Sequence, residues 1–85
     1  MRHARQGALD ELEPFLDRLR AVPGLVEKTR GVFYVRSKAF LHFHEDPSGL
    51  HADVRLGPEF TRVRVETEEE RDELLARIQD ALVGP

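Results

Sequence analysis

The spacing of apolar residues changes twice along this chain, which predicts a helix, then strands, then a second helix. Over residues 8–22 leucine and valine recur every three or four positions, the period of a helix with one apolar face. Over residues 31–66 apolar and polar residues alternate, which is typical of strands with one buried face. The helical period returns over residues 67–82. This order of elements predicts an α+β domain.

Two prolines bear on the first predicted helix. Pro14 lies inside the pattern, where it has no N–H to donate to the preceding turn. Either the helix kinks at this position, or its regular part begins near Glu13 and Pro14 occupies the first turn, which tolerates proline. Pro23 and Gly24 end the helix.

The alternating region predicts four strands in an antiparallel meander. They cover residues 31–36, 39–44, 50–56 and 61–66, and a short edge piece over residues 25–28 stays open. Thr67 followed by Glu70 is a capping box for the last helix. The predicted order is α-β-β-β-β-α, with both helices packed on one face of the sheet so that a single core forms. Residues 1–7 carry no pattern and are expected to be disordered, and residues 8–85 form one domain.

Composition narrows the classes of function. The 85 residues contain no cysteine, which excludes disulfides and thiolate metal sites. No apolar run approaches a membrane span of roughly 18 residues, and the N-terminus lacks the apolar core of a signal peptide, so a cytoplasmic location without membrane contact is expected. The net charge is −3, but the middle of the chain is locally basic and its last helix acidic.

The strands around residues 46–49 hold the densest group of residues with metal-binding or acid–base chemistry. Pairings that keep the alternation place residue 44 opposite 51 and 42 opposite 53, or 44 opposite 53. In either register four side chains share one face of the sheet and could bind one divalent ion of zinc type: His42, His44, His51 and Asp53. The alternatives are a solvated polar face and an acid–base or substrate-binding role. His3 lies in the patternless N-terminal segment and receives no role.

A second group of residues, basic and aromatic, is in phase with the histidines. It comprises Tyr34, Arg36, Lys38, Phe40, Arg55, Arg62 and Arg64. Such a face could bind a small anionic ligand, or stack the bases of a single-stranded nucleic acid. The acidic balance of the chain and the absence of a glycine-rich phosphate loop argue against nucleic acid.

Aromatic side chains on the solvated face indicate a surface that another molecule covers. Tyr34 and Phe40 are predicted there, and a second copy of the chain is the simplest cover, which predicts a homodimer. We therefore expect a non-catalytic domain that binds a ligand or a partner through the open sheet face, with the metal site as the alternative. An enzyme is the least expected class, because no nucleophile is paired with a base and no cofactor loop is present.

Three segments resemble a small bacterial family called the luciferase domain. They are residues 22–27 with a Pro-Gly-Leu opening, residues 37–44 with an H-x-H strand, and residues 52–56 with a following aspartate strand. A longer polar insert with histidine and tryptophan, which this family carries between its last two strands, is absent. A vaguer likeness to MmcQ/YjbR-like domains lies in residues 33–43 and the closing helix. Both resemblances imply a fold and supply no catalytic residues.

Overall fold

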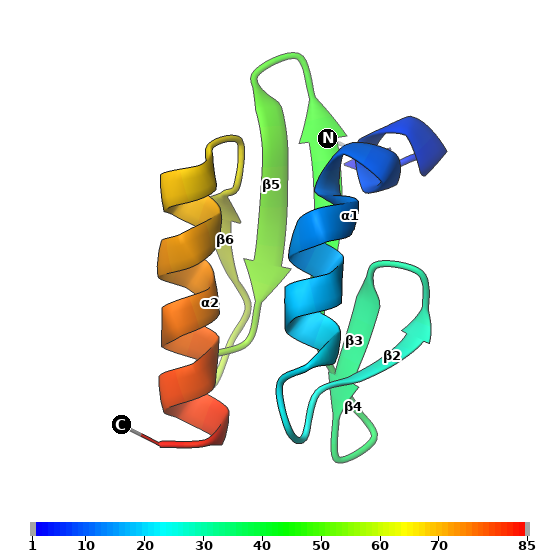
Figure 1. The fold of residues 1–85 in the computed structure, drawn as a ribbon. Coiled ribbons are helices and arrows are strands. Elements are labelled where there is room, and N and C mark those ends of the chain that lie inside the picture. The colour runs from blue at the N-terminus through cyan, green and yellow to red at the C-terminus, as the bar shows by residue number, and fades with distance from the viewer. Residues whose placement is uncertain (1, 85) are drawn as a thin grey trace.

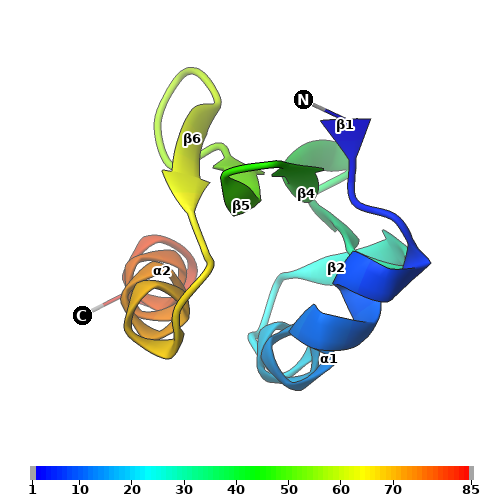
Figure 2. The same cartoon turned by 90° about the horizontal axis from the view of Figure 1, so that it is seen from above.

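Two helices lie side by side on one face of a twisted antiparallel sheet (Figures 1 and 2). The computed structural model describes residues 2–84. The helices are α1 (Gln6–Arg20) and α2 (Glu68–Leu82). None of the helices within residues 2–84 is long and apolar enough to cross a membrane.

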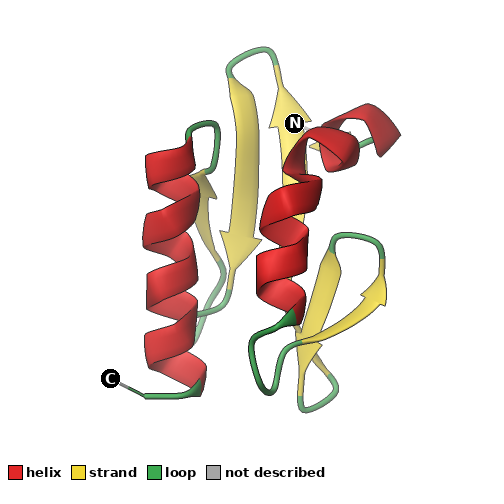
Figure 3. Cartoon of the chain, viewed as in Figure 1, coloured by secondary structure: helices red, strands yellow, loops and turns green. Residues whose placement is uncertain are grey.

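The sheet is built from five strands in sequence order, with a short sixth strand added at one edge of β4. The strands are β1 (Arg2–His3), β2 (Val26–Thr29), β3 (Val32–Val35), β4 (Lys38–Asp46), β5 (Gly49–Val54) and β6 (Thr61–Arg64). The order across the sheet is β2-β3-β4-β5-β6. Figure 3 shows how far β4 and β5 extend beyond their neighbours.

The predicted α+β class, with both helices on one face, is confirmed. The strand count differs from the prediction. The edge piece that the sequence left open is strand β2, and it adds a fifth strand to the meander. Within residues 1–7, where disorder is predicted, the structure has strand β1, which pairs with β4, and the first two residues of α1. Met1 lies outside the described residues.

The helix-facing side of β4 and β5 carries the core. Leu41 and Phe43 of β4 pair with Val54 and Ala52 of β5, and all four side chains are buried. The helices complete the core with leucines and isoleucine at helical spacing: Leu12, Leu16, Leu19, Leu74 and Ile78. Alternation then requires the intervening residues of both strands to lie on the opposite, open face.

Helix α1 continues through Pro14, which removes one bond of the helical ladder. The missing bond is the one to the carbonyl of Asp10, four residues earlier. Figure 3 shows the axis of α1 bending in its N-terminal half, as expected for an internal proline. Of the two predicted alternatives, the structure shows the helix that bends.

The start of α2 is fixed as the sequence predicts. Thr67 Oγ1 accepts a hydrogen bond from the Glu70 backbone N–H at 3.1 Å, and Glu70 Oε1 accepts one from the Thr67 N–H at 3.0 Å. A buried arginine, which no pattern in the sequence indicates, secures the same turn. Arg71 Nε donates to the Val65 carbonyl at 2.8 Å, and this side chain lies almost wholly inside the protein.

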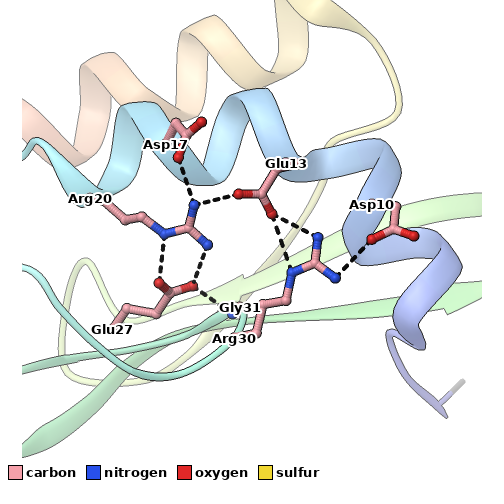
Figure 4. A network of polar contacts seen from close by, with 7 residues as sticks. All are labelled: Asp10, Glu13, Asp17, Arg20, Glu27, Arg30 and Gly31. Atoms are coloured by element: carbon pink, nitrogen blue, oxygen red, sulfur yellow. Dashed lines mark hydrogen bonds and ion pairs between the residues drawn. The ribbon is translucent and has the colours of Figure 1, made fainter.

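An arginine–carboxylate network fastens α1 to the hairpin of β2 and β3 (Figure 4). Its members are Asp10, Glu13, Asp17, Arg20, Glu27, Arg30 and Gly31. Arg20 donates to both carboxylate oxygens of Glu27, at 2.6 and 3.0 Å, and Glu27 Oε2 also accepts from the Gly31 N–H at 2.9 Å. Arg30 reaches Glu13 at 2.7 Å and Asp10 at 2.8 Å. Such bidentate, charge-assisted pairs fix the position of β2 against the helix.

The network makes stability depend on pH. The Arg20 hydrogen bonds hold the pKa of Glu27 below its ordinary value of 4.5. A lowered pKa contributes stability that is present above pH 4.5 and is lost as the pH falls below that value. We predict that Glu27→Gln lowers the free energy of unfolding by about 1–2 kcal/mol at pH 7. Urea titrations from pH 7 to pH 3.5 should show the difference between the two proteins shrinking below pH 4.5.

Glu73→Gln is the matched control, because Glu73 is exposed on α2. It should follow the wild-type curve at every pH. A constant difference between Glu27→Gln and wild type across the whole range would contradict the role of the Glu27 carboxylate.

Candidate metal centre on the open sheet face

The register of β4 and β5 places the hairpin histidines as the sequence predicts. His44 is paired with His51, and His42 with Asp53, the first of the two registers that keep the alternation. The pairing continues onto β6, where His51 faces Arg64 and Asp53 faces Arg62. The open face therefore carries two parallel rows of polar side chains across three strands.

The turn of the hairpin fixes this register. Asp46 pairs with Gly49, which leaves Pro47 and Ser48 as a two-residue loop. Asp46 Oδ1 accepts a hydrogen bond from the Ser48 N–H at 2.8 Å, the usual way in which aspartate closes a turn. Gly49 has a φ of +125°, a backbone conformation that L side chains rarely adopt.

Strand β1 adds a third histidine to the open face. Strand β3 pairs with the first half of β4, which leaves the edge of β4 near His44 free for β1. His3 is the partner of His44 in this pairing, and the two rings stack with centroids 4.9 Å apart and planes 27° apart. The backbone N–H of Ala4 donates to the Phe43 carbonyl at 3.1 Å, which secures the end of the strand.

Three histidines converge to within the reach of one metal ion. One ring nitrogen each of His3, His42 and His44 lies within 4.8 Å of the other two. Two nitrogens bound to one zinc ion at about 2 Å lie roughly 3.3 Å apart, so side-chain rotations that bring the rings at most about 1.5 Å closer would complete the site. The structure thus brings together two of the four predicted ligands, His42 and His44, and adds His3.

The other two predicted ligands lie beside the group of three and outside it. Asp53 Oδ2 is 2.9 Å from His44 Nε2, although the ring N–H direction is not that of a hydrogen bond. Arg62 holds this carboxylate with two hydrogen bonds, Nε to Oδ1 at 2.7 Å and Nη2 to Oδ2 at 2.8 Å. These bonds keep the pKa of Asp53 below its ordinary range. Asp53 is therefore an ionised carboxylate directed at a histidine, the usual partner of a metal-binding imidazole.

Among the residues that the structure describes, His42 and His44 have ring nitrogens without hydrogen-bond partners. His44 is only 8% exposed, and its Nδ1 and that of His42 have no hydrogen-bond partner within residues 2–84. Burial lowers the pKa of His42 and so favours the neutral imidazole. Buried polar atoms normally have partners, so these unpartnered imidazole nitrogens call for an explanation. His51 Nδ1 is also unpartnered, but this ring is not part of the group.

The predicted basic and aromatic surface does not form one patch. Arg36 and Lys38 are exposed at the β3–β4 turn, about 20 Å along β4 from His44. Tyr34 lies on the neighbouring strand under the Lys28 ammonium, which is 4.9 Å from the centroid of its ring. Arg36 and Lys38 are therefore remote from His44, and Tyr34 makes its contact with Lys28 and not with a histidine.

The arginines of this predicted surface are largely occupied. Arg62 is bound to Asp53, and Arg64 Nη1 lies 3.6 Å from Glu70 Oε2. Arg55 is stacked on Phe60, with the guanidinium carbon 4.5 Å from the ring centroid. Each of these three arginines therefore already has a neighbouring side chain as its partner.

Phe40 corrects the prediction of an aromatic group on the solvated face. It is 6% exposed and belongs to the core. Strand β3 pairs Phe33 with Leu41 and Tyr34 with Ala39, so β4 carries an extra residue at Phe40. Such a bulge interrupts the alternation on which the prediction rested. The apolar surface that suggested a second copy of the chain is therefore smaller than the sequence indicated.

No protein-family model, curated protein or solved structure matches this chain. The resemblances to the luciferase domain and to MmcQ/YjbR-like domains stay predictions.

The pairing of Asp53 and Arg62 can be tested in the metal-free protein. We predict that Asp53→Asn lowers the free energy of unfolding by about 1–2 kcal/mol, because Arg62 loses a charged partner whose own side chain is only 13% exposed. The same change in an Arg62→Gln background should have a clearly smaller effect, as a double-mutant cycle in urea would measure. Equal effects in both backgrounds would contradict the coupling, and Asp80→Asn on the exposed side of α2 is the neutral control.

Proposed function

We propose that this domain binds a divalent transition-metal ion of zinc type through His3, His42 and His44. The observation that carries the proposal is the convergence of one nitrogen from each ring to within 4.8 Å. Imidazole suits zinc, copper, nickel and cobalt, and a set of three histidines without cysteine favours these ions over calcium or magnesium, which prefer oxygen ligands.

The surroundings of the three rings support the same proposal. Asp53 Oδ2 lies 2.9 Å from His44 Nε2, and a small rotation of the ring that completes this hydrogen bond would leave the opposite nitrogen, Nδ1, for a metal ion. Carboxylates in this position fix the ring and raise its basicity as a ligand. Arg62 in turn fixes the carboxylate, which gives the site a preorganised second layer.

This proposal narrows the broader expectation of ligand binding on the open face. The homodimer, a protein partner, nucleic-acid binding and the cytoplasmic location stay predictions, and we propose no catalytic step.

Calorimetric titration with Zn²⁺ tests the proposal. We predict one bound ion per chain, and Co²⁺ and Ni²⁺ should compete for the same site. His3→Ala should lower the affinity for zinc roughly hundredfold or more, because it removes a direct ligand. Mutation of a residue that only hydrogen-bonds to a metal ligand already lowers metal affinity by about 10- to 100-fold. His3 is exposed, so this variant is expected to fold like the wild type.

His51→Ala is the control that distinguishes the group of His3, His42 and His44 from the group predicted from the sequence, which included His51. His51 lies next to His44 on the same face but outside the group of three. The His51→Ala protein should bind zinc with the affinity of the wild type. Loss of binding in His51→Ala with full binding in His3→Ala would overturn the assignment.

Metal binding should also order the N-terminal strand. Zinc that binds only the folded state at about 100 times its dissociation constant adds about 2.7 kcal/mol of stability. Because His3 lies on a strand of two residues, we predict that zinc slows hydrogen exchange at the Ala4 amide, which donates to the Phe43 carbonyl. Unchanged exchange at Ala4 in the presence of bound zinc would show that His3 is not a ligand.

A further inference from the structure

The charge of the open face indicates what else the proposed metal site would bind. Imidazole ligands are neutral, so an ion held by His3, His42 and His44 keeps its full charge of +2. Asp53 is the carboxylate in contact with these ligands, and its charge is already balanced by the two hydrogen bonds from Arg62. The immediate surroundings of the ion would therefore remain positive.

The number of ligands leaves room for an additional group. Zinc-type ions take four ligands, and three protein ligands leave one position for water or an exogenous ligand. Within residues 2–84 the converging group contains three residues. His3 is exposed, which leaves the site accessible from the solvent.

Arg62 adds a hydrogen-bond donor next to the carboxylate that contacts His44. Its Nε and Nη2 are used by Asp53, and its side chain is 46% exposed. Within the described part of the chain, the remaining amino group, Nη1, makes no hydrogen bond to another residue. Guanidinium N–H groups bind the oxygens of carboxylates and phosphates well.

We infer that the open position of the metal ion accepts a small oxyanion, a carboxylate or a phosphate, with Arg62 contributing to its binding. This inference rests on the proposed function, because the anion binds to the metal ion. It extends that proposal from a metal-binding domain to one that captures an anionic group at its surface.

Visible absorption of the Co²⁺-loaded protein separates the two claims. The d–d bands of cobalt first report whether the metal binds, and their change on addition of acetate or inorganic phosphate then reports an anion entering the coordination shell. We predict that bands appear with one equivalent of Co²⁺, and that at least one of the two anions shifts them. The anion that shifts the bands at lower concentration identifies the preferred class.

Variants of two arginines on β6 test whether Arg62 contributes to anion binding. Arg62→Gln releases Asp53 and should therefore bind Co²⁺ more weakly, but once it is saturated with Co²⁺ it should require about tenfold more anion, as expected for the loss of one charge-assisted hydrogen bond. Arg64→Gln is the matched control on the same strand, and it should respond like the wild type because Arg64 pairs with Glu70. Arg62→Lys keeps the charge and should recover part of the anion affinity.

Each failure has its own meaning. Absence of cobalt bands would overturn the proposed function and the inference together. Cobalt bands that neither anion changes would leave the metal site standing and overturn the inference. Equal anion affinities of Arg62→Gln and Arg64→Gln would overturn the role of Arg62.

Discussion

The pairing of β4 with β5 is the constraint on which the rest of the structure depends. Because side chains alternate along a strand, one register decides both faces of the sheet at once. Leu41 and Phe43 pack beneath the helices only if His42 and His44 lie on the opposite face. The hydrophobic core therefore positions the histidines, and a shift by one residue would lose the core and the cluster together.

That constraint also explains how much the sequence could predict. The alternation of residues 41–54 and the turn at Asp46 to Gly49 were sufficient to place His42, His44, His51 and Asp53 on one face. The predicted face was wrong for Phe40, where the alternation stops. The bulge at Phe40 directs this ring into the core, and no residue pattern announces a bulge before the partner strand is known.

His3 was missed for a different reason. A strand of two residues has no period to detect, and its position depends on the vacant edge that β3 leaves along β4. Only the comparison of strand lengths across the sheet reveals that edge. The Arg20 and Arg30 network was equally hidden, since its members are spread over residues 10–31 and meet through the packing of α1 on the β2–β3 hairpin.

The central claim is that three particular histidines, and not the fourth, bind the metal ion. Nuclear magnetic resonance of the imidazole nitrogens, with one equivalent of Zn²⁺ added, tests it most directly. The account predicts that ring nitrogens of His3, His42 and His44 change their chemical shifts as ligands do, while those of His51 keep the pattern of a free ring. Metal-type shifts at His51 with an unchanged His3, or no change at any of the four rings, would contradict it.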